Sequence, residues 1–246
     1  AKPKTGKVAY ILRRIGLDTA GDLRMISDWE IYFGLEVESY DDEDMEGFER
    51  PFDLEGADMV FVSESISSGN IAEMLYHQLD AVPLIAGEQA LLDDFSLGGS
   101  TTREDDDEDT IRIIDNEHPI TQGFPLGDLK ILDEPQTLGE IDNLPDGVRV
   151  LAVDPADEGS ARLWVIEEGT DIDGFAAPHM RIGTFVQGRE VYANLNDEGR
   201  QIMFNLFAYA LDEEPYYLVE PPAVLVSGNR TVTNNIIQPG ETTTIE

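Results

Sequence analysis

Short apolar runs alternate with amphipathic segments through the first hundred residues. The apolar runs predict buried strands, and most of them are followed by a segment in which apolar residues recur at helical spacing. We expect strands at 7–12, 35–40, 57–62 and 82–86. The intervening segments predict helices at 19–33 and 69–79, and a short helix that ends at Phe95. Strands joined by single helices predict right-handed crossovers and therefore a parallel sheet.

The pattern changes after residue 98, where strand-like runs follow one another with few helix-length segments between them. The polar, acidic stretch 98–109 (GGSTTREDDDED) is predicted as a loop. Further strands are expected at 110–114, 128–132, 148–153, 162–166, 181–186 and 190–193. Residues 196–211 predict the strongest helix, because two acids lie at its positive end and apolar residues recur along it. We therefore expect one α/β domain over residues 1–214, with a mostly parallel sheet flanked by helices.

Residues 215–246 have β-propensity but no helical spacing, and they predict an extended C-terminal arm. The apolar residues of this arm that could take part in assembly are Val224, Leu225, Val226, Val232, Ile236 and Ile237. An arm of this kind cannot bury its apolar side chains alone, and its backbone groups need a sheet edge to pair with. Two outcomes stay open: the arm folds back on its own sheet, or it adds a strand to a neighbouring copy and produces self-association.

Charge changes the picture most. The chain has 16 Lys and Arg against 51 Asp and Glu, for a net charge of −35. That charge repels phosphate backbones and anionic lipid, and we expect neither nucleic-acid binding nor membrane insertion, since no apolar stretch approaches 18 residues. Three of the four lysines lie within the first seven residues, and a body this poor in lysine is typical of adaptation to high salt; an ordinary acidic extracellular protein is the alternative.

Location and cofactors follow less directly from the sequence. The chain begins at Ala1, as it would after cleavage of a signal peptide or after trimming. We expect an extracellular or cell-surface protein, with the cytoplasm of a halophile as the alternative. The sequon at Asn229 matters only for a secreted protein. No cofactor is expected; among the acidic runs, Asp171 and Asp173 before Gly174 form the best calcium candidate, and a solvated surface is the competing interpretation.

Three segments, in order along the chain, resemble those of a known family. Residues 58–65 (DMVFVSES) are similar to the third strand, and the polar turn that follows, of the ThuA-like branch of the class I glutamine-amidotransferase-like fold. Residues 82–88 (VPLIAGE) resemble the strand that enters the nucleophile elbow, and residues 117–124 (EHPITQGF) look like an HPIT segment common in ThuA-like proteins. The resemblance covers residues 7–212 and implies a flavodoxin-like α/β sheet.

The resemblance also implies what is missing. An amidotransferase needs a Cys at the elbow, with a His–Glu pair behind it, because glutamine hydrolysis proceeds through a thioester. This chain has no Cys, and Glu88 occupies or adjoins that position, which makes the elbow degenerate. The ligand-pocket candidates are Ser63, Glu64, Ser65, Glu88 and His118. Each type has a structural alternative: turn chemistry for the serines, an anion at a helix N-terminus for Glu88, and a loop-fixing hydrogen bond for His118.

Two functions from different classes follow. In the first, the chain is a non-catalytic secreted or cell-surface structural protein that self-assembles through strand addition by its arm. In the second, it is a ThuA-like enzyme or sugar-binding protein that holds a carbohydrate in a cleft near Glu88 and His118. The missing thiol favours a protein that is not an enzyme. A pocket that brings Glu88 and His118 within hydrogen-bonding reach would favour the second function.

Overall fold

The computed structural model describes residues 6–13, 19–45, 56–75, 82–88, 90–91, 101–172, 174–186, 190–213, 217–218 and 236–237. The strands of the main sheet are β1 (Lys7–Leu12), β2 (Glu36–Asp41), β3 (Met59–Val62), β4 (Leu84–Ala86), β5 (Thr101–Glu108), β6 (Thr110–Ile113), β7 (Gly127–Lys130), β8 (Gln136–Asp142), β9 (Arg149–Val153), β10 (Ser160–Ile166) and β13 (Arg181–Gly183). The helices are α1 (Ala20–Asp28), α2 (Ser68–Leu75), α3 (Val191–Asn194) and α4 (Asp197–Ala210). A π-helical turn at Trp29–Phe33 continues α1, and a 3₁₀ turn at Asp42–Met45 follows β2.

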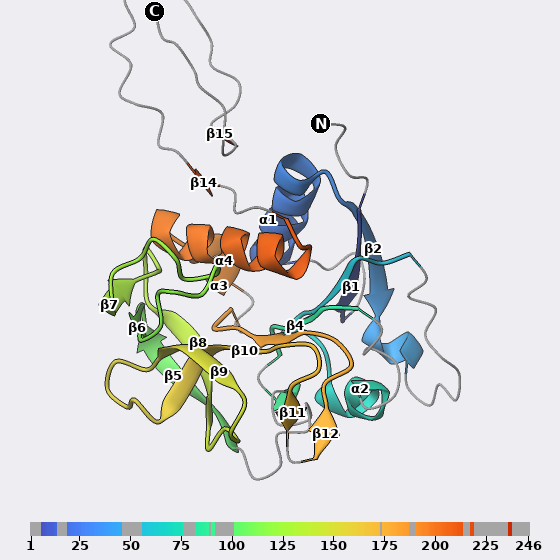
Figure 1. Cartoon of the computed structure of the whole chain (residues 1–246). Helices are drawn as coiled ribbons and strands as arrows, with labels where there is room; N and C mark the ends of the chain where they lie inside the picture. The colour runs from blue at the N-terminus through green and yellow to red at the C-terminus, as the bar shows by residue number, and fades with distance from the viewer. Residues whose placement is uncertain are drawn as a thin grey trace, which may run out of the picture.

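The inner strands of the parallel half of the sheet, β1, β3 and β4, are apolar on both faces. The order of this half is β2-β1-β3-β4-β13, and every neighbouring pair in it is parallel. Alternate residues of β1 enter two different cores: Tyr10 lies in the core that contains residues of α1 and α4, and Ile11 lies in the core that contains Ile71 of α2. Figure 1 shows α1, α3 and α4 on one side of these strands and α2 on the other. Cover on both faces explains why β1, β3 and β4 are continuous apolar runs, whereas the edge strand β2 is mostly polar.

The sheet continues beyond β13 as an antiparallel half. β10 pairs with β13, β9 pairs with β10, and β6 lies between β9 and β7. β8 also pairs with β10, and β5 pairs with β8. The α/β class, with a sheet flanked by helices, is confirmed. No helix in the described part of the chain is long and apolar enough to cross a membrane.

Two predicted elements are wrong. The acidic stretch 101–108, predicted as a loop, is strand β5 and pairs antiparallel with β8, with Thr101 opposite Asp142 and a register shift between Asp105 and Glu108. Backbone pairing to β8 forms this strand, and a polar edge strand leaves no apolar pattern to detect. Residues 190–193, predicted as a strand, instead begin helix α3, in which the Asn194 N–H bonds the Glu190 carbonyl 3.1 Å away. A short apolar run does not distinguish strand from helix.

Two short strands lie in the predicted arm. β14 (Tyr217–Leu218) pairs antiparallel with β15 (Ile236–Ile237), and Figure 1 draws both on the side of the molecule that carries α1 and α4. The assembly candidates Ile236 and Ile237 thus pair within their own chain. The other assembly candidates, Val224, Leu225, Val226 and Val232, and the sequon at Asn229 lie outside the described residues.

Candidate functional site

The carboxyl end of β3 carries the first group of candidate residues. Ser63 is buried, and its Oγ lies 3.0 Å from the Oγ of Ser65 and accepts the Ser65 backbone N–H at 3.2 Å. Ser65 Oγ also accepts the backbone N–H of Arg13 at 3.1 Å. These bonds join the turn after β3 to the end of β1 and give both serines a role in turn geometry. Glu64 lies in the same turn and lines the small cavity described below.

A carboxylate that the site prediction omitted organises this turn. Asp22, which is 7% exposed, accepts the hydroxyls of Tyr10 and, at 3.4 Å, Ser63 on Oδ1. Its Oδ2 accepts the backbone N–H of Thr19 at 2.9 Å and the Thr19 hydroxyl at 3.0 Å. The Asp22 backbone N–H in turn bonds Thr19 Oγ1, which completes a capping box at the start of α1. The spacing Thr19-x-x-Asp22 is a capping signal readable from the sequence.

A small cavity opens beside these groups. Its lining includes Tyr10, Asp22, Phe61, Ser63, Glu64 and Tyr192. The volume is about 20 Å³, which admits about one water molecule. Pockets that hold small organic ligands measure roughly 300–1,000 Å³. This cavity, as the described residues line it, therefore has room for solvent and is too small for a sugar or an amino acid.

Glu88 follows the end of β4 and does not line this cavity. Gly87 precedes it at a point where a Cβ atom would lie 2.9 Å from the Val62 carbonyl oxygen and 3.0 Å from that of Val186, so the backbones approach closely there. Glu88 Oε1 accepts the backbone N–H of Ala90 at 2.8 Å. This hydrogen bond closes the turn after β4 and gives Glu88 a local structural role.

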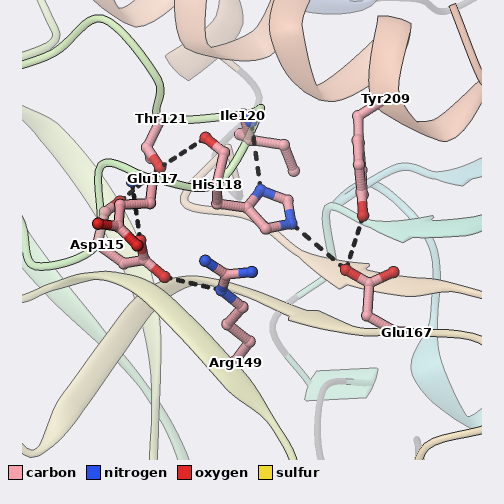
Figure 2. Close-up of polar contacts among 8 residues, drawn as sticks. All are labelled: Asp115, Glu117, His118, Ile120, Thr121, Arg149, Glu167 and Tyr209. Carbon is pink, nitrogen blue, oxygen red and sulfur yellow. Dashed lines mark hydrogen bonds and ion pairs between the residues drawn. The ribbon is translucent and has the colours of Figure 1, made fainter.

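His118 belongs to a different polar cluster, which Figure 2 shows. The ring is 1% exposed, and its Nδ1 accepts the backbone N–H of Ile120 at 3.2 Å. Because Nδ1 is an acceptor, Nε2 carries the proton, and it lies 3.4 Å from Glu167 Oε1. Tyr209 of α4 donates its hydroxyl to the same oxygen at 2.7 Å. The loop-fixing hydrogen bond expected for His118 is present.

Electrostatics follow from these bonds. Hydrogen bonding to His118 is the largest influence that lowers the pKa of Glu167, and the bond to Tyr209 and the charge of Arg149 add to it. Burial, together with the same carboxylate, raises the pKa of Tyr209 to about 12. Arg149 donates from Nε to Asp115 Oδ2 at 2.7 Å, and this bond lowers the pKa of Asp115.

Glu88 and His118 lie at opposite ends of the sheet. Ile166, the last residue of β10, is opposite Arg181, which pairs with Leu84 at the start of β4. Glu167 and its partner His118 therefore lie beside the start of β4, whereas Glu88 follows its end. The described residues do not bring these two candidates into one cleft, so the expectation of a cleft that uses both is wrong.

The calcium candidate lies in a hairpin. β11 (Asp171–Ile172) pairs with β12 (Phe175–Ala176), and Asp171 Oδ1 accepts the Gly174 backbone N–H at 2.6 Å. Asp173 lies outside the described residues. Within the described ranges, no three His, Asp or Glu side chains gather as a metal site would require. Calcium at this turn stays a prediction.

Sheet order and covering helices define an α/β protein with a mostly parallel sheet flanked by helices, and a solved structure shares this fold. Neither a family model nor a curated protein matches the chain. A protein from Thermoplasma acidophilum, described as a component of a "putative GMP synthase", aligns with a TM-score of 0.52 and 13% identity, over 85% of this chain and 95% of its own. A "putative ThuA-like protein" from Parabacteroides merdae aligns with a TM-score of 0.42 and 12% identity, over 74% and 79%.

The first of these likenesses establishes the fold alone, because identity is low. It confirms the α/β architecture, with a mostly parallel sheet flanked by helices, that the sequence predicted. The second is too weak in structural overlap to add an argument. The interpretation of Glu88 as the residue at a lost nucleophile position stays a prediction.

Proposed function

We propose that this chain is a non-catalytic amidotransferase-like protein, secreted or held at the cell surface, that acts by associating with other copies through its C-terminal arm. One observation supports the proposal that the chain is non-catalytic. The hydroxyl and carboxylate candidates Ser63, Ser65 and Glu88 are engaged in turn bonds, and the cavity that Ser63 lines holds about one water molecule.

Catalysis by Ser63 is disfavoured by its partners. A serine nucleophile needs an adjacent base that can take its proton. The nearest carboxylate partner, Asp22, lies 3.4 Å away and already accepts bonds from Tyr10 and from both the backbone and hydroxyl of Thr19. A carboxylate saturated in this way is held as a structural acceptor rather than as a base.

The arm supports the associative part of the proposal. Ile236 and Ile237 already adopt strand geometry against Tyr217 and Leu218, so this part of the sequence pairs readily. The run 223–226 (AVLV) is apolar and β-prone, and such a segment gains stability by adding to a sheet edge. An arm donated head to tail forms an open array unless the rotation closes.

Sedimentation velocity tests the association. The samples are the full chain, a chain ending at Glu214, and the full-length variants Val226→Asp and Ser227→Asp, all in molar KCl. Val226→Asp places a charge in the apolar run, and Ser227→Asp places the same charge beside it. We expect concentration-dependent association of the full chain and of Ser227→Asp, and its loss in the other two. A full chain that stays monomeric at high concentration and high salt contradicts the proposal.

Enzyme assays test the non-catalytic part separately. The purified chain is expected to release no ammonia from glutamine and to hydrolyse p-nitrophenyl acetate no faster than buffer. Turnover that disappears in Ser63→Ala or Glu88→Gln, while the fold persists by circular dichroism, would show that the strand ends hold an active site.

A further inference from the structure

Arg149 and Glu167 form a second polar constellation, away from the ends of the parallel strands where Ser63 and Glu88 lie. Arg149 begins β9 and Glu167 follows β10. Because these strands are antiparallel, the start of β9 and the end of β10 lie at the same end of the strand pair. Their side chains are 45% and 40% exposed. Figure 2 shows the Arg149 guanidinium between Asp115 and the pair formed by His118 and Glu167.

Each of the two charged groups is fixed from behind by other side chains. Asp115 holds Arg149 through Nε at 2.7 Å, while the two terminal nitrogens of the guanidinium make no hydrogen bond with the rest of the described chain. His118 and Tyr209 both donate to Oε1 of Glu167, while Oε2 accepts none from the described residues. Support of this kind orients the outward atoms before any ligand arrives.

The two charges are close without neutralising each other. Arg149 helps lower the pKa of Glu167, and Glu167 helps raise that of Arg149, so each lies within the field of the other. They form no direct ion pair, in contrast to Arg112 and Asp128 on the same half of the sheet, which lie 2.6 Å apart. The constellation therefore holds a guanidinium with two uncommitted terminal nitrogens and an ionised carboxylate with one uncommitted oxygen, each within the field of the other.

We propose that Arg149 and Glu167 bind a short zwitterion, a small molecule with one carboxylate and one ammonium group, as in an α-amino acid. The carboxylate accepts two parallel bonds from the terminal nitrogens of Arg149, and the ammonium donates to Oε2 of Glu167. Bonds between ionised partners are about twice as strong as neutral ones, and a guanidinium fork matches a carboxylate in shape.

Overall charge also selects this ligand class. A chain with net charge −35 repels simple anions at long range, and it attracts simple cations to its whole surface without selecting one place. A zwitterion has no net charge and escapes both effects. A site that offers both signs discriminates in its favour, and Arg149 and Glu167 offer both signs without forming an ion pair with each other.

Nuclear magnetic resonance titration of the full chain in molar KCl tests this proposal. The probes are glycine, β-alanine and 4-aminobutyrate, with acetate, methylammonium and glucose as controls at equal ionic strength. The side-chain N–H resonances of His118 and Arg149 report on the site. We expect saturable shifts with at least one zwitterion, at a concentration about tenfold lower than with acetate or methylammonium.

Variants identify the residues responsible. Arg149→Gln and Glu167→Gln are each expected to weaken zwitterion binding about tenfold, and Arg149→Lys to weaken it severalfold because it keeps the charge but loses the fork. The matched control Arg112→Gln removes an exposed guanidinium that is already paired, and it should leave binding unchanged within about twofold. Thermal melts check that each variant is folded. If Arg149→Gln does not fold, Arg149→Lys still tests the role of the guanidinium.

Several outcomes would overturn the proposal. Acetate or methylammonium that binds as well as the best zwitterion would mean that a single charge suffices. Glucose that binds as well would identify a neutral polyhydroxyl ligand instead. Unchanged zwitterion binding in Arg149→Lys and Glu167→Gln would place the ligand elsewhere on the chain.

Discussion

Replacing Asp22 by Asn tests whether the polar centre at the strand ends is structural. Four donors converge on this carboxylate: the hydroxyls of Tyr10 and Ser63, and the backbone N–H and hydroxyl of Thr19. Asn keeps one acceptor oxygen and turns an NH₂ group toward the remaining donors. Because Asp22 is 7% exposed, water cannot easily replace the acceptor that is lost.

The magnitude follows from the bonds that change. A buried hydrogen bond to a charged group contributes about 1.5–3 kcal/mol, and loss of a helix cap costs about 1 kcal/mol. The bond from Ser63 is long at 3.4 Å and adds little. We therefore expect Asp22→Asn to lower the free energy of unfolding by about 3 kcal/mol, which corresponds to a fall in Tm of about 6–12 °C for a chain of this size.

Urea unfolding and thermal melts in molar KCl measure this change with the repulsion among carboxylates screened. Asp157→Asn is the matched control, because Asp157 also accepts a backbone N–H, from Gly159 at 3.0 Å, but is exposed; its effect should stay within about 0.5 kcal/mol. Ser63→Ala should cost less than about 1 kcal/mol. If Asp22→Asn behaved like the control, the carboxylate would not be a structural acceptor, and a role in binding or catalysis would have to be considered.

Three further predictions address packing, pH and salt. Gly183→Ala should destabilise the fold by about 3 kcal/mol, because its Cβ would overlap the buried indole of Trp164, whereas Gly69→Ala in open space on α2 should stabilise by up to about 1 kcal/mol; urea melts compare the two. Tyr209→Phe should lower the free energy of unfolding by about 1 kcal/mol at pH 7, a value that allows for the exposure of Glu167. The wild type should lose stability as pH rises from 10 to about 12, because the Tyr209 hydroxyl ionises, and the variant should not show this loss. Since the pKa of Glu167 is lowered in the folded chain, the ionised carboxylate contributes to the stability of the fold above pH 4.5. This contribution is lost as pH falls through the folded pKa, and melts of the wild type and Tyr209→Phe at acid pH measure the loss. Tm should rise between dilute buffer and molar KCl, since the net charge of −35 repels itself over a range that falls to about 3 Å at about 1 M salt; an equal or lower Tm in salt would contradict the halophilic interpretation.

The parallel half of the sheet was predictable because each of its inner strands is buried on both faces. Burial on both faces leaves an uninterrupted apolar run in the sequence, as in β1, β3 and β4. The edge strand β5 left no such trace. Its residues are mostly acidic, and what makes it a strand is a backbone ladder with β8, from Thr101 opposite Asp142 to Glu108 opposite Gln136, which a local pattern does not encode.

The candidate sites divide in the same way. The capping box of Thr19 and Asp22 is local, so its spacing could have identified Asp22 as an organising carboxylate. The loop-fixing role of His118 was also readable, because its acceptor bond reaches only two residues along the chain. Its partnership with Glu167 spans 49 residues and depends on how β10 is placed beside the loop after β6. That placement is tertiary, and the sequence offered no periodic signal for it.

The distribution of charge over the sheet edges links salt to the proposed association. β2 pairs only with β1, and β5 only with β8, in the described part of the chain, and these outer strands read EVESYD and TTREDDDE. Edge carboxylates discourage strand addition, and their repulsion is strongest at low ionic strength. An arm that adds to such an edge should therefore do so only when salt screens the edge.

Stability and association should then both rise as the KCl concentration rises, but for separable reasons. A chain ending at Glu214 keeps the acidic body, so its Tm should still rise with salt while its association is lost. If truncation also removed the salt dependence of Tm, the arm itself would be the main source of that stabilisation, and screening of the body would not explain it.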